Sequence, residues 1–244
     1  MRATSIISGL MLIGLACLAS NAGASTQLTP HAAKYKVKIS ILGGRLSTRL
    51  SATEEGYEAN YLVEPKGLAA IIANGNIEAT SHFVDTNVGF LPDRHQTADS
   101  ISDDKIQATL DFDWNTEAKT GTVTGKLNGE DVEQSLDSIV HDFVTLQYEI
   151  ARDLKNGTIK DEYILFEPDE LTPVEISTVG NDRLEVPYGQ FDVIGVRHQG
   201  KGSSRTTTFW FAPDLDYIPI VIERHRKGKT LFRAVLDEYT ASPE

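Results

Sequence analysis

The segment Thr206–Lys229 constrains the fold of this chain most tightly, because it holds two strand-like runs joined by a proline-bearing corner. The first run ends at Trp210–Phe211, and every second residue of Ile218–Ile222 in the second run is isoleucine. Such alternation is typical of an antiparallel sheet with one covered face. Proline fixes φ and has no N–H, so we expect Pro213 at a turn and Pro219 near a strand start or edge.

Alternation with a period of two recurs along most of the chain and predicts further strands. The first run covers Lys34–Ile41, with Gly43-Gly44 as its expected turn. Asn128-Gly129 predicts a tight hairpin turn later in the chain. The other strand-like runs lie at residues 46–52, 57–63, 77–83, 106–114, 120–127, 162–166, 174–179, 183–186, 190–198, 205–211, 218–224 and 230–238.

One segment, Ser138–Lys155, has the periodicity of an amphipathic helix instead, since its apolar residues recur at spacings of three and four. Asp137 or Ser138 can cap its start, and Asn156-Gly157 is a stop signal. We therefore expect a single curved antiparallel sheet or half-open β-barrel of about ten strands, with one inserted amphipathic helix.

A helix of this length can cover only part of the concave face of such a sheet, so the remainder is a candidate ligand groove. The short apolar segment Gly67–Ala73 is either core or lid packing, or a mobile flap over this groove. No repeat or low-complexity linker divides residues 25–244, which we interpret as a single β-rich domain.

Residues 1–24 have the pattern of a secretory signal peptide: Arg2, then a nearly continuous apolar run, then Ala22-Gly23-Ala24 as a cleavage site. An uncleaved N-terminal anchor helix is one alternative, and lipidation at Cys17 is another, less favoured because Gly14 stands where a large aliphatic residue is expected. We expect no transmembrane span in the mature chain.

Cleavage after Ala24 would remove Cys17, the only cysteine, and would change the net charge from −12 to −13 through the loss of Arg2. The mature protein would then have neither a disulfide nor a thiol nucleophile. An acidic surface of this kind argues against nucleic acid and anionic membrane faces as partners.

The six histidines show no metal-ligand or catalytic-triad spacing, so we expect no metal, no cofactor and no catalytic residue. Asp93-Arg94-His95 is the least implausible polar site, although a loop salt bridge is the simpler interpretation. His141-Asp142 places a titratable pair on the predicted helix, but no H-E-x-x-H motif accompanies it.

The chain has several pairs of closely spaced carboxylates, but a hydrolase would need two carboxylates that face each other across a cleft. Asp111 and Asp113 share one strand face opposite Phe112, and we expect that face to be solvated. The other pairs are Asp103-Asp104 and Asp214 with Asp216.

The chain resembles the DUF3108 family of exported bacterial proteins, whose function is unassigned, over almost the whole mature region. The motifs that carry the resemblance are Pro65-x-Gly67, Phe112-x-Trp114, Leu154-x-x-Gly157, Pro187-x-Gly189-x-Phe191 and Trp210-x-Ala212-Pro213-Asp214-Leu215-x-Tyr217-Ile218-Pro219. The resemblance implies the periplasm and a fold similar to periplasmic lipoprotein-carrier and RseB-type domains, whose cavities take acyl chains. It supplies no catalytic residues.

From these observations we expect a non-enzymatic periplasmic binding protein that holds a lipid or acyl chain between the concave face and the helix. One alternative is an envelope assembly or sensor module that binds another envelope protein, and a further one is a polysaccharide hydrolase. The candidate ligand-lining residues are Phe112, Trp114, Phe143, Leu146, Trp210 and Ile220.

Overall fold

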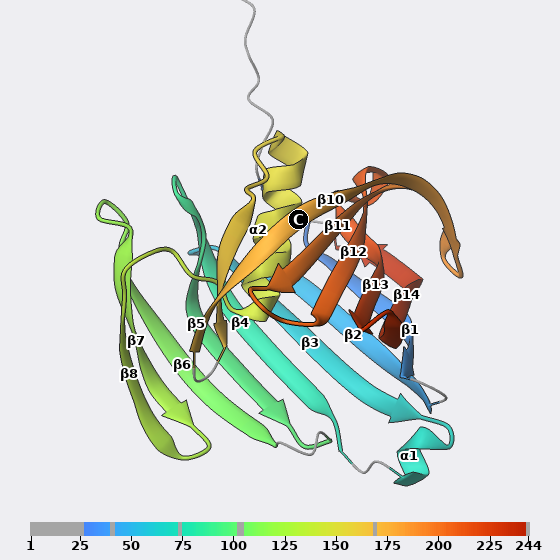
Figure 1. Ribbon diagram of the computed structural model, residues 1–244, viewed down its shortest axis with the longest axis horizontal. Helices are drawn as coiled ribbons and strands as arrows, with labels where there is room; N and C mark the ends of the chain where they lie inside the picture. The colour runs from blue at the N-terminus through green and yellow to red at the C-terminus, as the bar shows by residue number, and fades with distance from the viewer. Residues whose placement is uncertain (1–26, 40–41, 73–74, 102–104, 168–169, 243–244) are drawn as a thin grey trace, which may run out of the picture.

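The computed structural model describes residues 27–39, 42–72, 75–101, 105–167 and 170–242. Its main element is one sheet of fourteen antiparallel strands that curves strongly without closing (Figure 1). The strands are β1 (His31–Ile39), β2 (Leu42–Ala52), β3 (Tyr57–Lys66), β4 (Ile77–Thr86), β5 (Gly89–Asp99), β6 (Ile106–Asn115), β7 (Thr120–Leu127), β8 (Glu130–Leu136), β9 (Glu162–Glu167), β10 (Glu170–Val186), β11 (Gly189–Gly200), β12 (Arg205–Ala212), β13 (Ile218–Arg226) and β14 (Lys229–Ala241).

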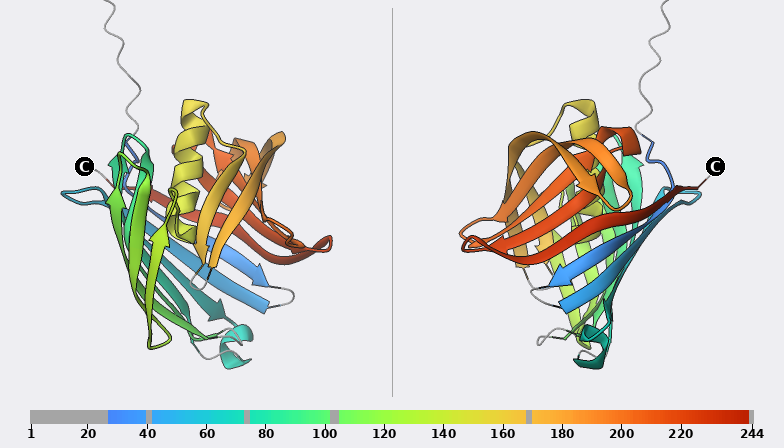
Figure 2. Two further views of the ribbon diagram at one scale, coloured as in Figure 1. Left: turned by 60° about the vertical axis from the view of Figure 1, so that its left-hand side comes forward. Right: turned by 90° about the vertical axis from the view of Figure 1, so that its right-hand side faces the viewer.

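The strands form two meanders that meet where the first strand pairs with the last, in the order β8-β7-β6-β5-β4-β3-β2-β1-β14-β13-β12-β11-β10-β9. The edges of the sheet are therefore β8 and β9. Helix α2 (Phe143–Asn156) connects these two edges and lies inside the curve of the sheet (Figure 2). A short helix, α1 (Ala69–Ile72), and a 3₁₀ turn, η1 (Pro213–Leu215), complete the described elements.

The expected curved antiparallel sheet with one inserted helix is confirmed, but the strand number of about ten is wrong. The alternation rule missed β5, where Pro92 and a bulge at Asp93 interrupt the pattern. It also missed β8, an edge strand that is almost entirely polar. The two runs expected at 174–179 and 183–186 are one strand, β10, which is bent by a bulge at Gly180.

The helix begins five residues later than expected, and its cap is Asp142 rather than Asp137 or Ser138. The preceding segment is extended because its backbone pairs with the edge strand β9: the His141 N–H donates to the Ile164 carbonyl at 2.9 Å, and the Phe166 N–H donates to the His141 carbonyl at 2.8 Å. The predicted stop is confirmed, since Gly157 is left-handed with φ of 68°.

Two turn predictions had opposite outcomes. Asn128-Gly129 forms the β7–β8 hairpin turn, with both residues at positive φ. Gly43-Gly44 is not a turn, because both glycines pair with β1 inside β2. A Cβ on Gly44 would lie 2.9 Å from the Glu64 carbonyl oxygen, so close backbone approach explains this glycine.

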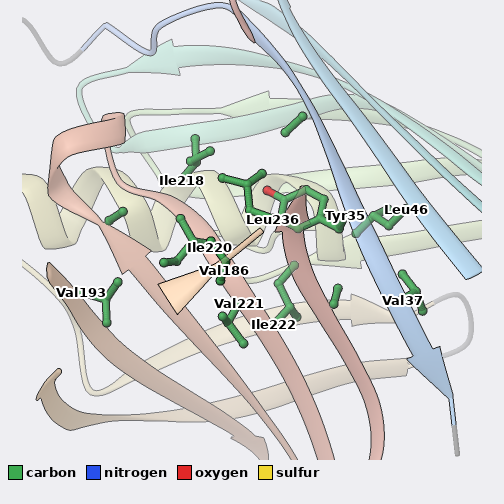
Figure 3. Packing of buried hydrophobic residues seen from close by; sticks show 13 residues of the cluster. Tyr35, Val37, Leu46, Val186, Val193, Ile218, Ile220, Val221, Ile222 and Leu236 are labelled. Carbon is green, nitrogen blue, oxygen red and sulfur yellow. The ribbon is translucent and has the colours of Figure 1, made fainter. Parts of the chain in front are cut away.

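The proline corner has the expected form. Pro213 opens η1, and Pro219 is the second residue of β13, next to a bulge in the β12–β13 pairing. Asp216 and Tyr217 both have positive φ, 54° and 59°, and the Tyr217 N–H closes the corner on the Ala212 carbonyl at 2.9 Å. Side chains on both sides of the corner join the cluster shown in Figure 3.

Helix α2 is buried on every side over residues 144–151, so it fills the part of the curve in which it lies. Val144 and Tyr148 pack with side chains of β3, β4 and β5. Leu146 and Ile150 pack with side chains of β9 to β12, including Phe211. The space between the helix and the sheet is therefore packed with side chains.

Candidate functional site

Three buried polar side chains from different elements meet at the start of α2. The Ser81 hydroxyl donates to Asp142 Oδ1 at 2.8 Å and lies 2.8 Å from His95 Nδ1. His95 Nδ1 is 3.3 Å from the same carboxylate oxygen. Asp142 also accepts from the Val144 and Thr145 N–H groups and from the Thr145 hydroxyl. One carboxylate thus caps the helix and ties it to β4 and β5.

These residue types occur in serine hydrolases, but their geometry here is that of a structural clasp. In a catalytic triad the histidine uses one ring nitrogen for the serine and the other for the carboxylate. Here both short contacts of His95 are made by Nδ1, and Ser81 is fully buried. Burial by itself would raise the pKa of Asp142, but the His95 charge and the hydrogen bonds to the carboxylate outweigh it and hold that pKa well below its usual range.

A second polar cluster lies near the other end of α2, around the fully buried carboxylate of Glu149. Glu149 accepts from the Phe90 N–H at 2.9 Å, from Arg152 at 2.8 Å and from Lys160 at 3.0 Å. Asp153, one turn further on, accepts from the Tyr163 hydroxyl at 2.7 Å. Every oxygen of Glu149 is engaged, and the cluster anchors the helix to β5 and β9.

Replacing Glu149 by glutamine should change how stability depends on pH. Burial raises the pKa of Glu149, although the Phe90 N–H and the two cations oppose the shift. Folding then favours the protonated acid, so this group stabilises the fold below its unfolded-state pKa and loses that contribution as pH rises through the folded-state pKa. The unfolding free energy of the wild type minus that of Glu149→Gln should therefore decrease as pH rises above the usual glutamate pKa of about 4.3. Urea titrations measure this difference.

The exposed residue Glu162 provides the control, since Glu162→Gln also removes one carboxylate but leaves the buried cluster intact. A difference that instead increases with pH would show that the cations around Glu149 dominate over its burial.

Beyond the start of α2, the inner face of the sheet continues without helix cover (Figure 1). Most of its side chains are apolar, and Thr97 and Asp99 are the polar ones in the second and third rows described below. Cross-strand pairing arranges its side chains in rows across β3 to β6. The row at the helix start is fully buried. In the second row two of the four residues are partly accessible, and in the third row all four are. In order of increasing distance from the helix the rows are Ala59, Ser81, His95 and Leu110; Tyr61, Ala79, Thr97 and Ala108; and Val63, Ile77, Asp99 and Ile106. We call the second and third rows the floor.

Two further apolar features border the floor. The Phe143 ring, the first residue of α2, is 47% exposed and packs edge-on against Tyr61 at 6.5 Å and against His95 at 5.3 Å. Helix α1 follows the end of β3, with Ala69 buried against the sheet and Leu68 and Ile71 exposed. Of the segment Gly67–Ala73, Ala73 lies outside the described residues.

Of the six candidate lining residues, only Phe143 borders the floor. Phe112 and Trp114 are stacked in a separate cluster with Phe166, where the Trp114 indole N–H donates to the Pro92 carbonyl at 2.7 Å. Leu146 lies in the packed interface between the helix and β9 to β12. Ile220 and the half-buried Trp210 belong to the cluster at the proline corner. The sequence therefore did not single out Tyr61, Val63, Ile77 and Ile106 as a set.

The Trp210 indole ring covers Gly195 on the neighbouring strand: a Cβ on Gly195 would lie 2.8 Å from the ring. This glycine provides the space that the ring occupies.

The remaining polar candidates are dispersed. Asp111 and Asp113 are exposed, as predicted, and Asp216 accepts from the Thr29 N–H and from Lys155. Asp103-Asp104 lies outside the described residues. The buried His141 ring has no hydrogen-bond partner in the described part of the chain, and burial lowers its pKa to about 4. Within that part, no three histidine, cysteine or acidic side chains gather as metal ligands would.

A small hollow between α2, the proline corner and the start of β1 has a cavity volume of about 10 Å³. Leu28, His31, Tyr148 and Tyr217 are among its lining residues. That volume suits about one water molecule and is far too small for an acyl chain.

These features define a class of protein: an open, strongly curved antiparallel sheet that holds one helix in its concave side and leaves an apolar floor beyond it. Among the described residues no helix combines the length and apolarity that a membrane span requires. The chain belongs to the DUF3108 family, because the family model, described as "Protein of unknown function", matches residues 32–230, well over half of the chain. A search of the curated proteins found no match.

Proposed function

We propose that this protein is an exported, non-enzymatic binding protein of the periplasm that holds an apolar ligand, a lipid or an acyl chain, on the floor. The observation that most directly supports this proposal is the partial accessibility of four residues on the concave face beyond the helix: Tyr61, Val63, Ile77 and Ile106. An apolar concave surface with few polar groups is the surface that such a ligand needs.

The ligand position in this proposal differs from the one expected from the sequence. A chain held between the helix and the sheet would have to displace Val144, Leu146 and Tyr148, which are all buried in packed clusters. The floor needs no such displacement. Its rows cross four strands, a width of about 14 Å at the usual strand spacing, which can accommodate an acyl chain lying across the strands.

The proposal can be tested with two neighbouring residues of β3 that point to opposite faces. Val63 lies on the floor, and Leu62 lies on the outer face opposite Glu78 and Ser47. Both are apolar and half-buried. Val63→Asp should weaken binding of a fluorescent long-chain fatty acid by about tenfold or more, because a carboxylate would replace apolar contact. Leu62→Asp should leave binding within about twofold of the wild type.

Fluorescence titration gives both affinities, and native mass spectrometry of the purified protein detects a bound lipid. Absence of fatty-acid binding by the wild type, or equal losses in both variants, would contradict a site on the floor. Thermal melts of both variants show whether they are folded.

A second candidate function, binding of another envelope protein, is supported by the edge strand β8, whose outer side pairs with no described strand. An unpaired edge can accept a strand from a partner. Exposed Glu130, Asp131 and Glu133 discourage such pairing, so this function ranks below the first. The hydrolase alternative ranks lower still, because the buried pair Glu149 and Asp153 is occupied by Arg152 and Lys160 rather than open to a cleft.

A further inference from the structure

Most of the exposed large apolar side chains gather at one end of the sheet. This end, called the open end here, is where the odd-numbered strands finish and the even-numbered strands begin. It lies opposite the described chain termini and the C-terminal end of α2, and it carries α1 (Figure 1). Its exposed apolar residues are Ile39 at 47%, Leu68 at 76%, Ile71 at 80% and Leu231 at 39%. Clustered exposure of this kind marks an interaction surface.

Part of this end carries a concentration of positive charge that the acidic composition does not suggest, whereas the β7–β8 and β9–β10 turns at the same end carry the exposed residues Glu130, Asp131, Glu167 and Glu170. Two neighbouring turns, β11–β12 and β13–β14, present five exposed cations, and none of them forms an ion pair with a carboxylate among the described residues. These cations are Lys201, Arg205, Arg226, Lys227 and Lys229. The chain as a whole has a net charge of −12, so this local excess opposes the average.

Some of these cations also lie directly opposite one another on paired strands. Arg205 lies directly across from Arg226 in the β12–β13 pairing, and Arg226 lies across from Lys229 in the β13–β14 pairing. Like charges in directly opposed positions destabilise a sheet. Fold stability therefore does not explain this arrangement, whereas an anionic partner at the open end would compensate the repulsion.

Apolar and cationic residues alternate on one hairpin. The exposed Leu231 follows Lys229 and precedes Arg233 on β14, and exposed Lys38 and Ile39 end the adjacent β1. Apolar groups that enter a bilayer, flanked by cations that contact its headgroups, define an interfacial membrane-binding surface. A nucleic acid or an acidic polysaccharide would use the cations but not the exposed Leu68 and Ile71.

We propose that the open end is a docking surface for a phospholipid bilayer that carries anionic headgroups. The basic turns contact the headgroups, and Leu68, Ile71 and Leu231 enter the interface. The net negative charge of the whole molecule does not prevent this contact, because charges more than about 10 Å away are largely screened at physiological salt. This inference does not rest on the proposed function, although a membrane-facing end beside the floor would suit a lipid ligand.

The test is vesicle co-sedimentation in about 0.1 M salt, with phosphatidylcholine vesicles that contain about one-third phosphatidylglycerol and with pure phosphatidylcholine vesicles. The wild type should bind the anionic vesicles more tightly. Arg226→Glu with Lys229→Glu should weaken that binding more than about tenfold, since each cation near an anionic surface contributes about fivefold. The matched control, Lys119→Glu with Arg183→Glu, changes the net charge equally but lies outside the open end, and it should have little effect.

The apolar contribution is tested separately with Leu68→Ser and Ile71→Ser, two exposed positions whose replacement should leave thermal melts unchanged. This variant should bind both vesicle types less than the wild type does. The proposal is overturned if the wild type does not bind anionic vesicles, or if both charge-reversal variants lose binding equally. It is also overturned if the apolar variant binds vesicles normally, which would point to a soluble polyanion as the partner of the cations.

Discussion

An Asp142→Ala variant is expected to lose about 3–5 kcal/mol of unfolding free energy, because breaking a buried pair leaves its partners uncompensated. The substitution would remove the acceptor for the Ser81 hydroxyl and for two N–H groups of the first helical turn. It would also leave His95 beside an apolar methyl group. A loss of this size is a large part of the typical stability of a domain, so the helix should detach from the sheet at much lower urea concentrations.

Asp137→Ala is the matched control, because Asp137 is exposed, precedes the same helix and is one of the two caps that the sequence predicts. Its effect should be within about 0.5 kcal/mol. Urea unfolding of the two variants, followed by circular dichroism, separates them. Equal losses would mean that the cap in solution is not Asp142.

The pH dependence of the wild type gives a second measurement of the same clasp. Because the folded-state pKa of Asp142 is lowered, its contribution is fully present above the unfolded-state pKa and is lost as pH falls through the folded-state value. Acidification should therefore destabilise the wild type more than Asp142→Asn. The opposite order would contradict a carboxylate that is held in its charged form.

A Gly89→Ala variant is expected to lose about 2–4 kcal/mol, for two separable reasons. Gly89 has φ of 138°, a conformation that L residues rarely adopt. In addition, a Cβ at this position would lie 2.7 Å from Glu149 Oε1 and 3.2 Å from Arg152 Nη2. The carboxylate cannot easily retreat, because the Phe90 N–H, Arg152 and Lys160 all hold it.

Gly129→Ala isolates the backbone contribution, since Gly129 has φ of 92° but no heavy atom lies within 4 Å of the position that its Cβ would take. It should lose about 1–2 kcal/mol. The additional loss in Gly89→Ala then reports the clash with Glu149. If both variants lose the same unfolding free energy, the side chains around Glu149 shift enough to accommodate the extra methyl group.

The sequence by itself determined the local structure wherever one rule dominated. Alternation identified most strands of the sheet, and the stop at Asn156-Gly157 and the turn at Asn128-Gly129 follow from residues that tolerate positive φ. The positions of Pro213 and Pro219 follow from the missing N–H and the fixed φ of proline. These features depend on a few neighbouring residues, so they can be recognised without tertiary contacts.

Tertiary structure decided the features that depend on contacts between segments far apart in the sequence. The helix begins late because β9 takes the backbone of His141 into pairing, and Asp142 becomes the cap because Ser81 and His95, far away in the sequence, meet it there. The floor is likewise a product of register: one residue of slip would turn Val63 outward and Leu62 inward. No local pattern carries this information, because strand register and helix placement are fixed only when the whole sheet curves around its core.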